Sequence, residues 1–146
     1  IIAGNVPSGN NYDSLFALPN VEYLGYIQQE ELFSRIYGAA GIFSLYDPSL
    51  EINRKAASNK LYDAMMLGIP VVSNTGIDAE EFIRSNGIGV CISYHYDDTW
   101  KILCSDKFLS DTERMGLKGR KLYMERFSFR QNFSVKLNDL MNEIIK

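Results

Sequence analysis

The chain has 146 residues, of which 46% are hydrophobic and 23% charged, and its formal net charge is −3. These values are typical of one globular domain with room for a hydrophobic core. The lysines and arginines are scattered, so the basic stripe of a nucleic-acid binder is missing and we exclude nucleic acid as a partner. No apolar run approaches the roughly 20 residues that cross a bilayer, which predicts a soluble protein.

The cysteines and the histidine argue against a metal site and against a Ser-His-Asp catalytic triad. Cys91 and Cys104 lack CxxC spacing and no secretory signal precedes them, so we expect free thiols in a reducing cytosol. His95 is the only histidine, so neither a histidine-rich metal site nor a Ser-His-Asp arrangement with a second candidate base can be assembled, and we expect it in a turn. The sequence therefore predicts a cytoplasmic protein without a metal site.

Short apolar runs alternate with helical patterns along the chain. We expect strands at 1–3, 21–24, 41–45, 70–73 and 89–92. We expect helices at 12–18, 29–39, 59–67 and 78–86. Because most of the gaps can hold the crossovers that parallel strands require, the pattern predicts an α/β fold, a Rossmann-like open parallel sheet with helices on both faces.

Capping signals and one apolar stripe mark the later helices. Residue pairs with capping-box spacing predict helix starts at Asp78 with Glu81, Ser110 with Glu113, and Ser128 with Gln131. The last helix carries a stripe formed by Phe129, Phe133, Leu137, Leu140 and Ile144. We expect this stripe to pack within the domain or on a neighbouring domain, and any part left bare would favour self-association.

An open parallel sheet binds ligands beyond the carboxyl ends of its strands, and two segments there stand out. The loop 46–58 leads to Ser58, an expected N-cap whose helix start suits a phosphate, and Lys60 adds a cation. The small-residue turn 73–76 would let a ligand approach the backbone. A plain capped helix with a solvated lysine explains the same local pattern. Neither G-x-G-x-x-G nor a P-loop occurs, which argues against a dinucleotide enzyme or an NTPase.

The segment 58–72 reads S-N-K-L-Y-D-A-M-M-L-G-I-P-V-V. It resembles the donor-site helix and the following strand of the large GT-B glycosyltransferase family, which includes glycogen and sucrose synthases and many bacterial polysaccharide transferases. In that family the segment reads approximately N-K-L-x-[ED]-x-M-x-x-G-x-P-V-[VI]. The resemblance continues in register at 20–26, 31–40, 85–89 and 125–129, so that nearly the whole chain is covered.

The resemblance implies that the chain is the C-terminal, donor-binding half of a retaining, metal-independent glycosyltransferase of bacterial cell-surface polysaccharide or glycolipid synthesis. It implies one nucleotide-sugar-binding domain over 1–146, with the first strand and helix of that domain and an N-terminal acceptor domain encoded before Ile1. The donor would be a UDP- or GDP-linked sugar, with no further cofactor. The isolated chain would be inactive, and the resemblance allows association with the inner face of the membrane through the acceptor domain.

The resemblance also assigns the donor site. The assigned residues are Gly25, Tyr26, Ser58, Asn59, Lys60, Leu61, Asp63, Ser73, Asn74, Thr75 and Gly76. Asp63 stands where the family usually has Glu, and it would accept hydrogen bonds from the ribose hydroxyls. The segment 73–76 would line the diphosphate, and Gly25 with Tyr26 would flank the base.

One position departs from the family pattern. The first acid of its acid-x7-acid pair would fall at position 55, which is Lys55 here, and this leaves Glu51 as the candidate catalytic carboxylate. Two alternatives stay open: a non-enzymatic α/β partner-binding module with a decayed nucleotide site, and half of a sugar-nucleotide epimerase, which shares the GT-B architecture. A measurement of uridine or guanosine diphosphate binding would distinguish the glycosyltransferase half from the non-enzymatic module.

Overall fold

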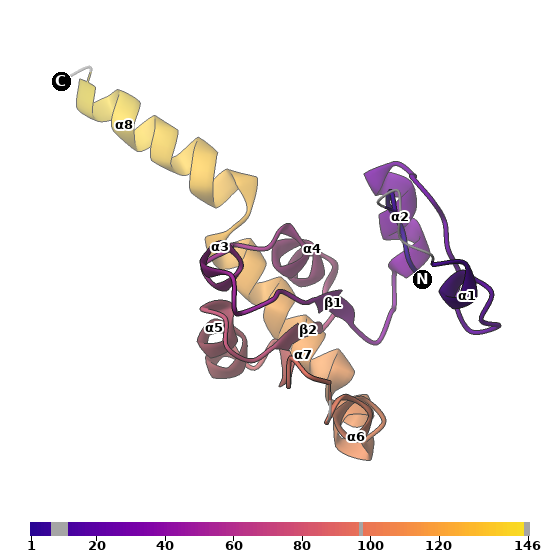
Figure 1. Cartoon of the computed structure of the whole chain (residues 1–146). Helices are drawn as coiled ribbons and strands as arrows, with labels where there is room; N and C mark the ends of the chain where they lie inside the picture. The colour runs from indigo at the N-terminus through magenta and orange to yellow at the C-terminus, as the bar shows by residue number, and fades with distance from the viewer. Residues whose placement is uncertain (7–11, 97, 145–146) are drawn as a thin grey trace. The chain divides into compact units, whose positions relative to one another are not determined.

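The computed structural model describes residues 1–6, 12–96 and 98–144 (Figure 1). The chain forms two compact units, Ile1–Gly38 and Ala39–Lys146. The parallel sheet and the residues of its carboxyl edge belong to the second unit.

The first unit contains two helices and one isolated pair of extended segments. The helices are α1, Asp13–Phe16, and α2, Gln29–Ile36, which confirms the two helices expected in this region. The runs expected as strands at 1–3 and 21–24 meet only in a parallel bridge between Ile2 and Tyr23. Their assignment as strands of the main sheet is wrong, because each run forms only this one bridge and neither pairs with a described strand of the sheet.

The second unit is built on a parallel sheet, which has three strands in the described part of the chain. The strands are β1, Ile42–Ser44, β2, Val71–Asn74, and β3, Gly89–Ile92, in the order β1-β2-β3. All four residues of the central strand are buried, as expected when both faces of a parallel sheet are covered. The strands expected at 41–45, 70–73 and 89–92 are thereby confirmed, and so is an open parallel sheet.

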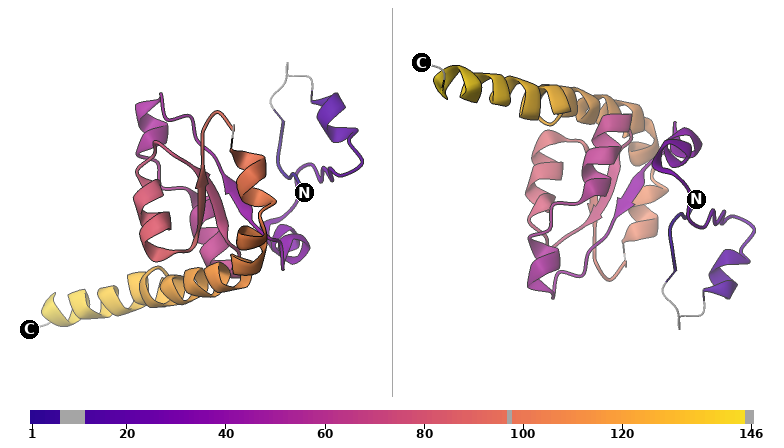
Figure 2. Two further views of the ribbon diagram at one scale, coloured as in Figure 1. Left: turned by 90° about the horizontal axis from the view of Figure 1, so that it is seen from below. Right: turned by 90° about the horizontal axis from the view of Figure 1, so that it is seen from above.

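Helices cover both faces of this sheet (Figure 2). On one face, Val71 packs with residues of α4, Asn59–Leu67, and α5, Ala79–Asn86. On the other, Val72 packs with Phe108 and Met115 in the first half of α7, Asp106–Arg126, and α6, Thr99–Leu103, lies beside them. The second half of α7 packs against α4, where Leu122 joins the core of the first face. Successive residues of a strand point to opposite faces, so β2 supplies both halves of the core.

Two of the expected capping boxes do not form in the described chain. The hydroxyl of Ser105 caps α7 by accepting a hydrogen bond from the Phe108 N–H at 3.1 Å. Ser110 therefore lies inside that helix, where its hydroxyl donates to the carbonyl of Lys107. Asp78 precedes α5 in a helical backbone conformation, and its side chain makes no capping bond there. Box spacing fits both positions, but which hydroxyl or carboxylate meets a free N–H depends on where the preceding loop turns.

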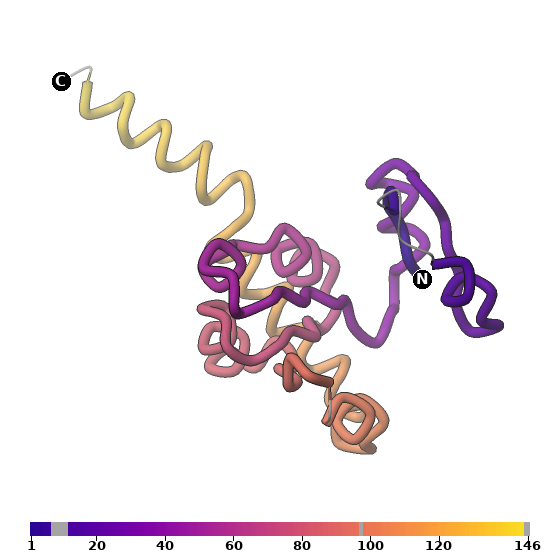
Figure 3. The backbone as a smooth tube through the Cα atoms, in the orientation of Figure 1, coloured from indigo at the N-terminus to yellow at the C-terminus, as the bar shows by residue number. Residues whose placement is uncertain are grey.

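The C-terminal segment leaves the core. A short π-helix, η1, Arg130–Val135, follows α7 and continues as α8, Lys136–Ile144 (Figure 3). The Ser128 hydroxyl accepts from the Gln131 N–H at 3.4 Å, which agrees with the expected start of this helix. α8 contacts η1 and extends away from the sheet. The whole apolar stripe is exposed, so the expected packing within the domain is absent from the described residues.

α7 is the longest helix described, with 21 residues, and many of them are charged. Among the described helices, none combines the length and the apolar composition that crossing a membrane requires.

The two thiols should differ strongly in reactivity. Cys91 of β3 is buried, whereas Cys104 is exposed after α6. Burial raises the pKa of the Cys91 thiol from 9.0 to about 11, against the opposite effect of the Arg84 charge. Two pKa units lower the thiolate fraction about 100-fold. With an aromatic disulfide reagent at pH 8, we expect one fast thiol in the native protein and the second only on unfolding. Cys104→Ser should remove the fast phase, and a fast phase that survives it would contradict the buried position of Cys91.

Candidate ligand site at the carboxyl edge of the sheet

The loop after β1 crosses the end of the central strand. The backbone N–H of Tyr46 donates to Oδ1 of Asn74 at 2.7 Å, and this amide is fully buried. Pro48 lies against the turn after β2, since a Cβ added at Gly76 would be 3.1 Å from the Pro48 Cβ. The carboxyl edge is therefore a closed polar layer and not a row of separate loops.

Buried hydroxyls hold the start of α4 to the end of β1. Ser44 donates its hydroxyl to Oγ of Ser58 at 2.7 Å, and the Tyr46 hydroxyl donates to the same oxygen at 3.2 Å. Ser58 thus stands at the N-cap position, as expected, but among the described residues its side chain bonds to these two hydroxyls and does not cap the helix. The first turn of α4 begins with the exposed residues Asn59 and Lys60 and keeps its positive end without a side-chain cap.

The turn expected to line the diphosphate uses its own N–H groups within the chain. The Thr75 N–H donates to the carbonyl of Ile92 at 2.9 Å, and the Gly76 N–H donates to Oε2 of Glu80 at 2.9 Å. Ser73 is buried in β2 and donates its hydroxyl to the carbonyl of Ser44. A ligand that used the Gly76 N–H would have to displace the Glu80 carboxylate.

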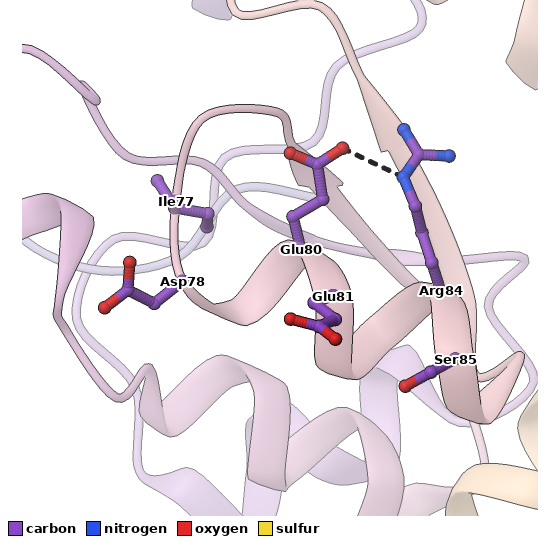
Figure 4. A pocket seen from close by; sticks show the side chains of 6 residues that line it. All are labelled: Ile77, Asp78, Glu80, Glu81, Arg84 and Ser85. Atoms are coloured by element: carbon purple, nitrogen blue, oxygen red, sulfur yellow. Dashed lines mark hydrogen bonds and ion pairs between the residues drawn. The ribbon is translucent and has the colours of Figure 1, made fainter.

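Glu80 belongs to a short chain of contacts on α5. Its Oε1 accepts from Nε of Arg84 at 2.9 Å (Figure 4). Nη2 of Arg84 in turn donates to the carbonyl of Cys91 at 3.1 Å. These side chains border a surface cavity of about 450 Å³, together with Asp78, Glu81 and neighbouring residues. The contacts tie the turn after β2 and the end of β3 to α5, the helix that carries most of the residues lining this cavity.

Asp63 differs from the other polar residues of this region. It lies in the second turn of α4 and is partly buried, and burial raises the pKa of its carboxyl while the Lys60 charge lowers it. In the described part of the chain, its carboxylate forms neither a hydrogen bond nor an ion pair. Leu61, two residues earlier, has its side chain in the core and its N–H bonded to the Ser58 carbonyl. Of the assigned residues of α4, the structure leaves Asn59, Lys60 and Asp63 accessible.

The candidate catalytic carboxylate lies on a separate short helix. Glu51 begins α3, Glu51–Arg54, and its Oε1 accepts from Nζ of Lys55 at 2.8 Å. Both side chains are exposed. Lys55 also borders a second cavity of about 270 Å³, lined by Leu61 and by the aromatic rings of Tyr62, Phe82 and Phe127. Glu51 is therefore paired with Lys55, at the position where the resemblance led us to expect an acid.

The assigned residues Gly25 and Tyr26 belong to the first unit. Gly25 has a left-handed backbone with φ of 61°, and its carbonyl accepts from the Gly4 N–H at 2.7 Å. Tyr26 is 72% exposed, so its ring is free to meet a ligand or a partner.

Sequence reasoning missed several polar residues of this edge. Hydrogen bonds from Ser49 lower the pKa of Asp47, and the charge of Asp47 adds to burial in raising the pKa of Tyr94. Asp47 lies in the loop 46–58 that the sequence already indicated as a ligand segment, whereas the only signal for Tyr94 was its place shortly after the strand expected at 89–92. The hydrogen bonds of Ser44, Tyr46 and Glu80 could not be predicted from the sequence, because their partners are 14 or more residues away or depend on the path of a turn.

The geometry defines an α/β protein with a small open parallel sheet and a polar carboxyl edge. Comparisons of the chain with protein-family models, with curated proteins and with solved structures gave no match. Among the described residues, no group of three or more histidine, cysteine or acidic side chains is placed to hold a metal ion.

Proposed function

We propose that the chain binds a nucleoside-diphosphate sugar at the carboxyl edge of its sheet and is the donor-binding half of a GT-B glycosyltransferase. The proposal rests on the resemblance of segment 58–72 and on one structural observation. The carboxylate of Asp63 is partly buried and has no hydrogen-bond or ion-pair partner among the described residues. Under it, the enzyme is retaining and metal-independent, transfers the sugar of a UDP- or GDP-linked donor, and works in the cytoplasm on a polysaccharide or glycolipid acceptor held by another domain.

Asp63 supports the proposal because it is a partly buried carboxylate without a partner. A carboxyl group that loses water on folding normally regains hydrogen bonds or an ion pair inside the protein. The carboxylate of Asp63 has neither within the described chain, and Lys60 is the only charge that favours its ionised form. A ligand with vicinal hydroxyls, such as a ribose, would supply the missing donors.

The start of α4 supports the same ligand. The Ser58 hydroxyl is engaged by Ser44 and Tyr46, so the exposed first turn is open to an anion. A helix N-terminus attracts phosphate through its N–H groups and its dipole, and Lys60 adds a positive charge there. Asp63 lies one turn further along the same helix. The spacing would place a phosphate at the helix start and a ribose beside Asp63.

The test is Asp63→Ala in the protein encoded by the complete reading frame. Loss of the ribose hydrogen bonds should cost about 1.5–3 kcal/mol, which raises the dissociation constant of UDP or GDP about 10- to 150-fold by calorimetry. Thermal stability without ligand should not fall. A folded pKa raised by burial means that the ionised carboxyl weakens folding above its unfolded pKa of 3.8, and alanine removes that effect.

Asp139→Ala provides the matched control. Asp139 is an exposed carboxylate on α8, so its loss changes the net charge by the same amount at a distance from the proposed site. Nucleotide affinity should stay unchanged in this variant. If neither UDP nor GDP binds the unsubstituted protein, or if Asp63→Ala binds as tightly as Asp139→Ala, the proposed donor site is wrong.

One observation favours a non-enzymatic α/β module instead. The N–H groups of Thr75 and Gly76 are already bonded to Ile92 and Glu80, so the turn is complete without a phosphate. In such a module the polar edge would serve only to hold the loops. The calorimetric titration separates the two functions, because a module of this kind would show no affinity for either nucleotide.

A further inference from the structure

The C-terminal helix presents an apolar surface without a partner. Phe133, Leu137, Leu140 and Ile144 lie at spacings of three and four residues, which places them on one side of η1 and α8. They are 53%, 41%, 52% and 70% exposed, respectively. We call these four residues the C-terminal seam. The spacing of the seam is that of one side of a two-helix pair.

The charges beside the seam are divided between its two ends. Lys136 directly precedes Leu137, and Glu143 directly precedes Ile144, so the two charges are one heptad apart on the same flank. Arg130 adds a positive charge at the beginning of η1. Within the described residues, the Glu143 carboxylate has no ion-pair partner, and the Lys136 ammonium group bonds only to the side-chain amide of Asn132. The flank is therefore positive at its start and negative at its end.

We propose that a second copy of this chain docks on the C-terminal seam as an antiparallel helix. In this arrangement, Leu137 faces Leu140 of the second copy and Phe133 faces Ile144 of the second copy. The same register brings Lys136 beside Glu143 of the second copy. Two-fold symmetry repeats each contact, so that one pairing creates four apolar layers and two ion pairs from the same few residues.

The parallel alternative lacks this charge match. In a parallel pair, Lys136 lies beside the residue five positions further along the second copy. That residue is Met141, which carries no charge. Only the antiparallel pairing sets the positive half of each helix against the negative half of the other.

The seam is short, so the association should be weak. It spans about three helical turns, and such a pair buries less than the roughly 1,200–2,000 Å² of a stable standard interface. Detection therefore needs a wide concentration series. Because α8 stands away from the sheet, substitutions in the seam leave the core unchanged.

Sedimentation equilibrium of the chain at concentrations up to about 1 mM tests the proposal, since such short interfaces are weak. We expect a monomer–dimer equilibrium that Leu140→Glu abolishes. Leu117→Glu is the matched control, because Leu117 is 64% exposed on α7, outside the seam, and this variant should associate as before. Unchanged thermal unfolding of both variants would show that the fold is intact.

A charge exchange tests the orientation. Lys136→Glu and Glu143→Lys should each weaken the dimer by about 3- to 30-fold, because each places like charges together twice by symmetry. The double variant should restore association, since both pairs then form with reversed signs. A strictly monomeric chain would overturn the proposal and assign the seam to another partner. Association that survives Leu140→Glu, or a double variant as weak as the single ones, would overturn it as well.

Discussion

Gly116→Ala is expected to lower the free energy of unfolding by about 3 kcal/mol, the largest loss that we predict for a single methyl group. Gly116 is buried where α7 crosses the end of α4, and a Cβ there would overlap the carbonyl oxygen of Gly68. Gly68 ends α4 in a left-handed conformation with φ of 70°. The obstacle is backbone that cannot rotate away, so the two helices would have to separate.

Gly119→Ala is the control, three residues along the same helix. Its added methyl group would lie 3.5 Å from atoms of Met65, which is ordinary van der Waals contact. Alanine also favours a helix by up to about 1 kcal/mol over glycine. We expect this variant to be as stable as the unsubstituted protein or more so in urea unfolding. Equal stability of the two alanine variants would contradict the close crossing of α4 and α7.

Asn74→Ala is expected to lower the free energy of unfolding by about 2–4 kcal/mol. The Asn74 amide accepts from the Tyr46 N–H at 2.7 Å and donates to the Thr75 carbonyl at 2.9 Å. Alanine fills neither role, so the N–H that orders the loop after β1 loses its partner. The predicted donor-site residue Asn74 thereby acts first as a structural link between β2 and that loop.

Asn59→Ala provides the comparison within the same polar edge. Asn59 is exposed at the first position of α4, so its replacement should change stability by less than about 0.5 kcal/mol. Urea unfolding of both variants without ligand measures the difference. If Asn74→Ala proved as stable as Asn59→Ala, Asn74 would not hold the loop, and a role toward ligand alone would remain.

Apart from Gly25 and Tyr26 of the first unit and the core residue Leu61, the donor-site residues assigned by resemblance fall into two groups in the structure. Asn59, Lys60 and Asp63 are accessible on α4, where a ligand can reach them. The segment 73–76 and Ser58 are engaged in bonds within the chain. The pattern N-K-L-Y-D places side chains along one helix, so it predicts their relative positions. This pattern does not predict which backbone N–H groups will form hydrogen bonds with other segments of the chain. The nucleotide site and the single domain over 1–146 stay predictions.

The strands expected at 41–45, 70–73 and 89–92 were predictable because each is an apolar run bounded by helix or turn signals. The runs at 1–3 and 21–24 show the same local pattern, yet they form only one bridge. A strand exists only when a neighbour completes its hydrogen bonds, and the neighbour lies far away in the sequence. Local composition does not predict which apolar runs will pair as strands.

The sequence by itself determined what depends on neighbouring residues. This includes the alternation of strands and helices, the amphipathic C-terminal stripe, and the start of α4 after Ser58. Three features depend on the tertiary structure alone. They are the close crossing of α4 and α7 at Gly116, the hydrogen bond that holds the loop after β1 to Asn74, and the hydrogen bond from the Gly76 N–H to Glu80. Helical and strand periods repeat within a few residues, whereas these contacts require segments brought together by folding, and their geometry is set by the packing of the core.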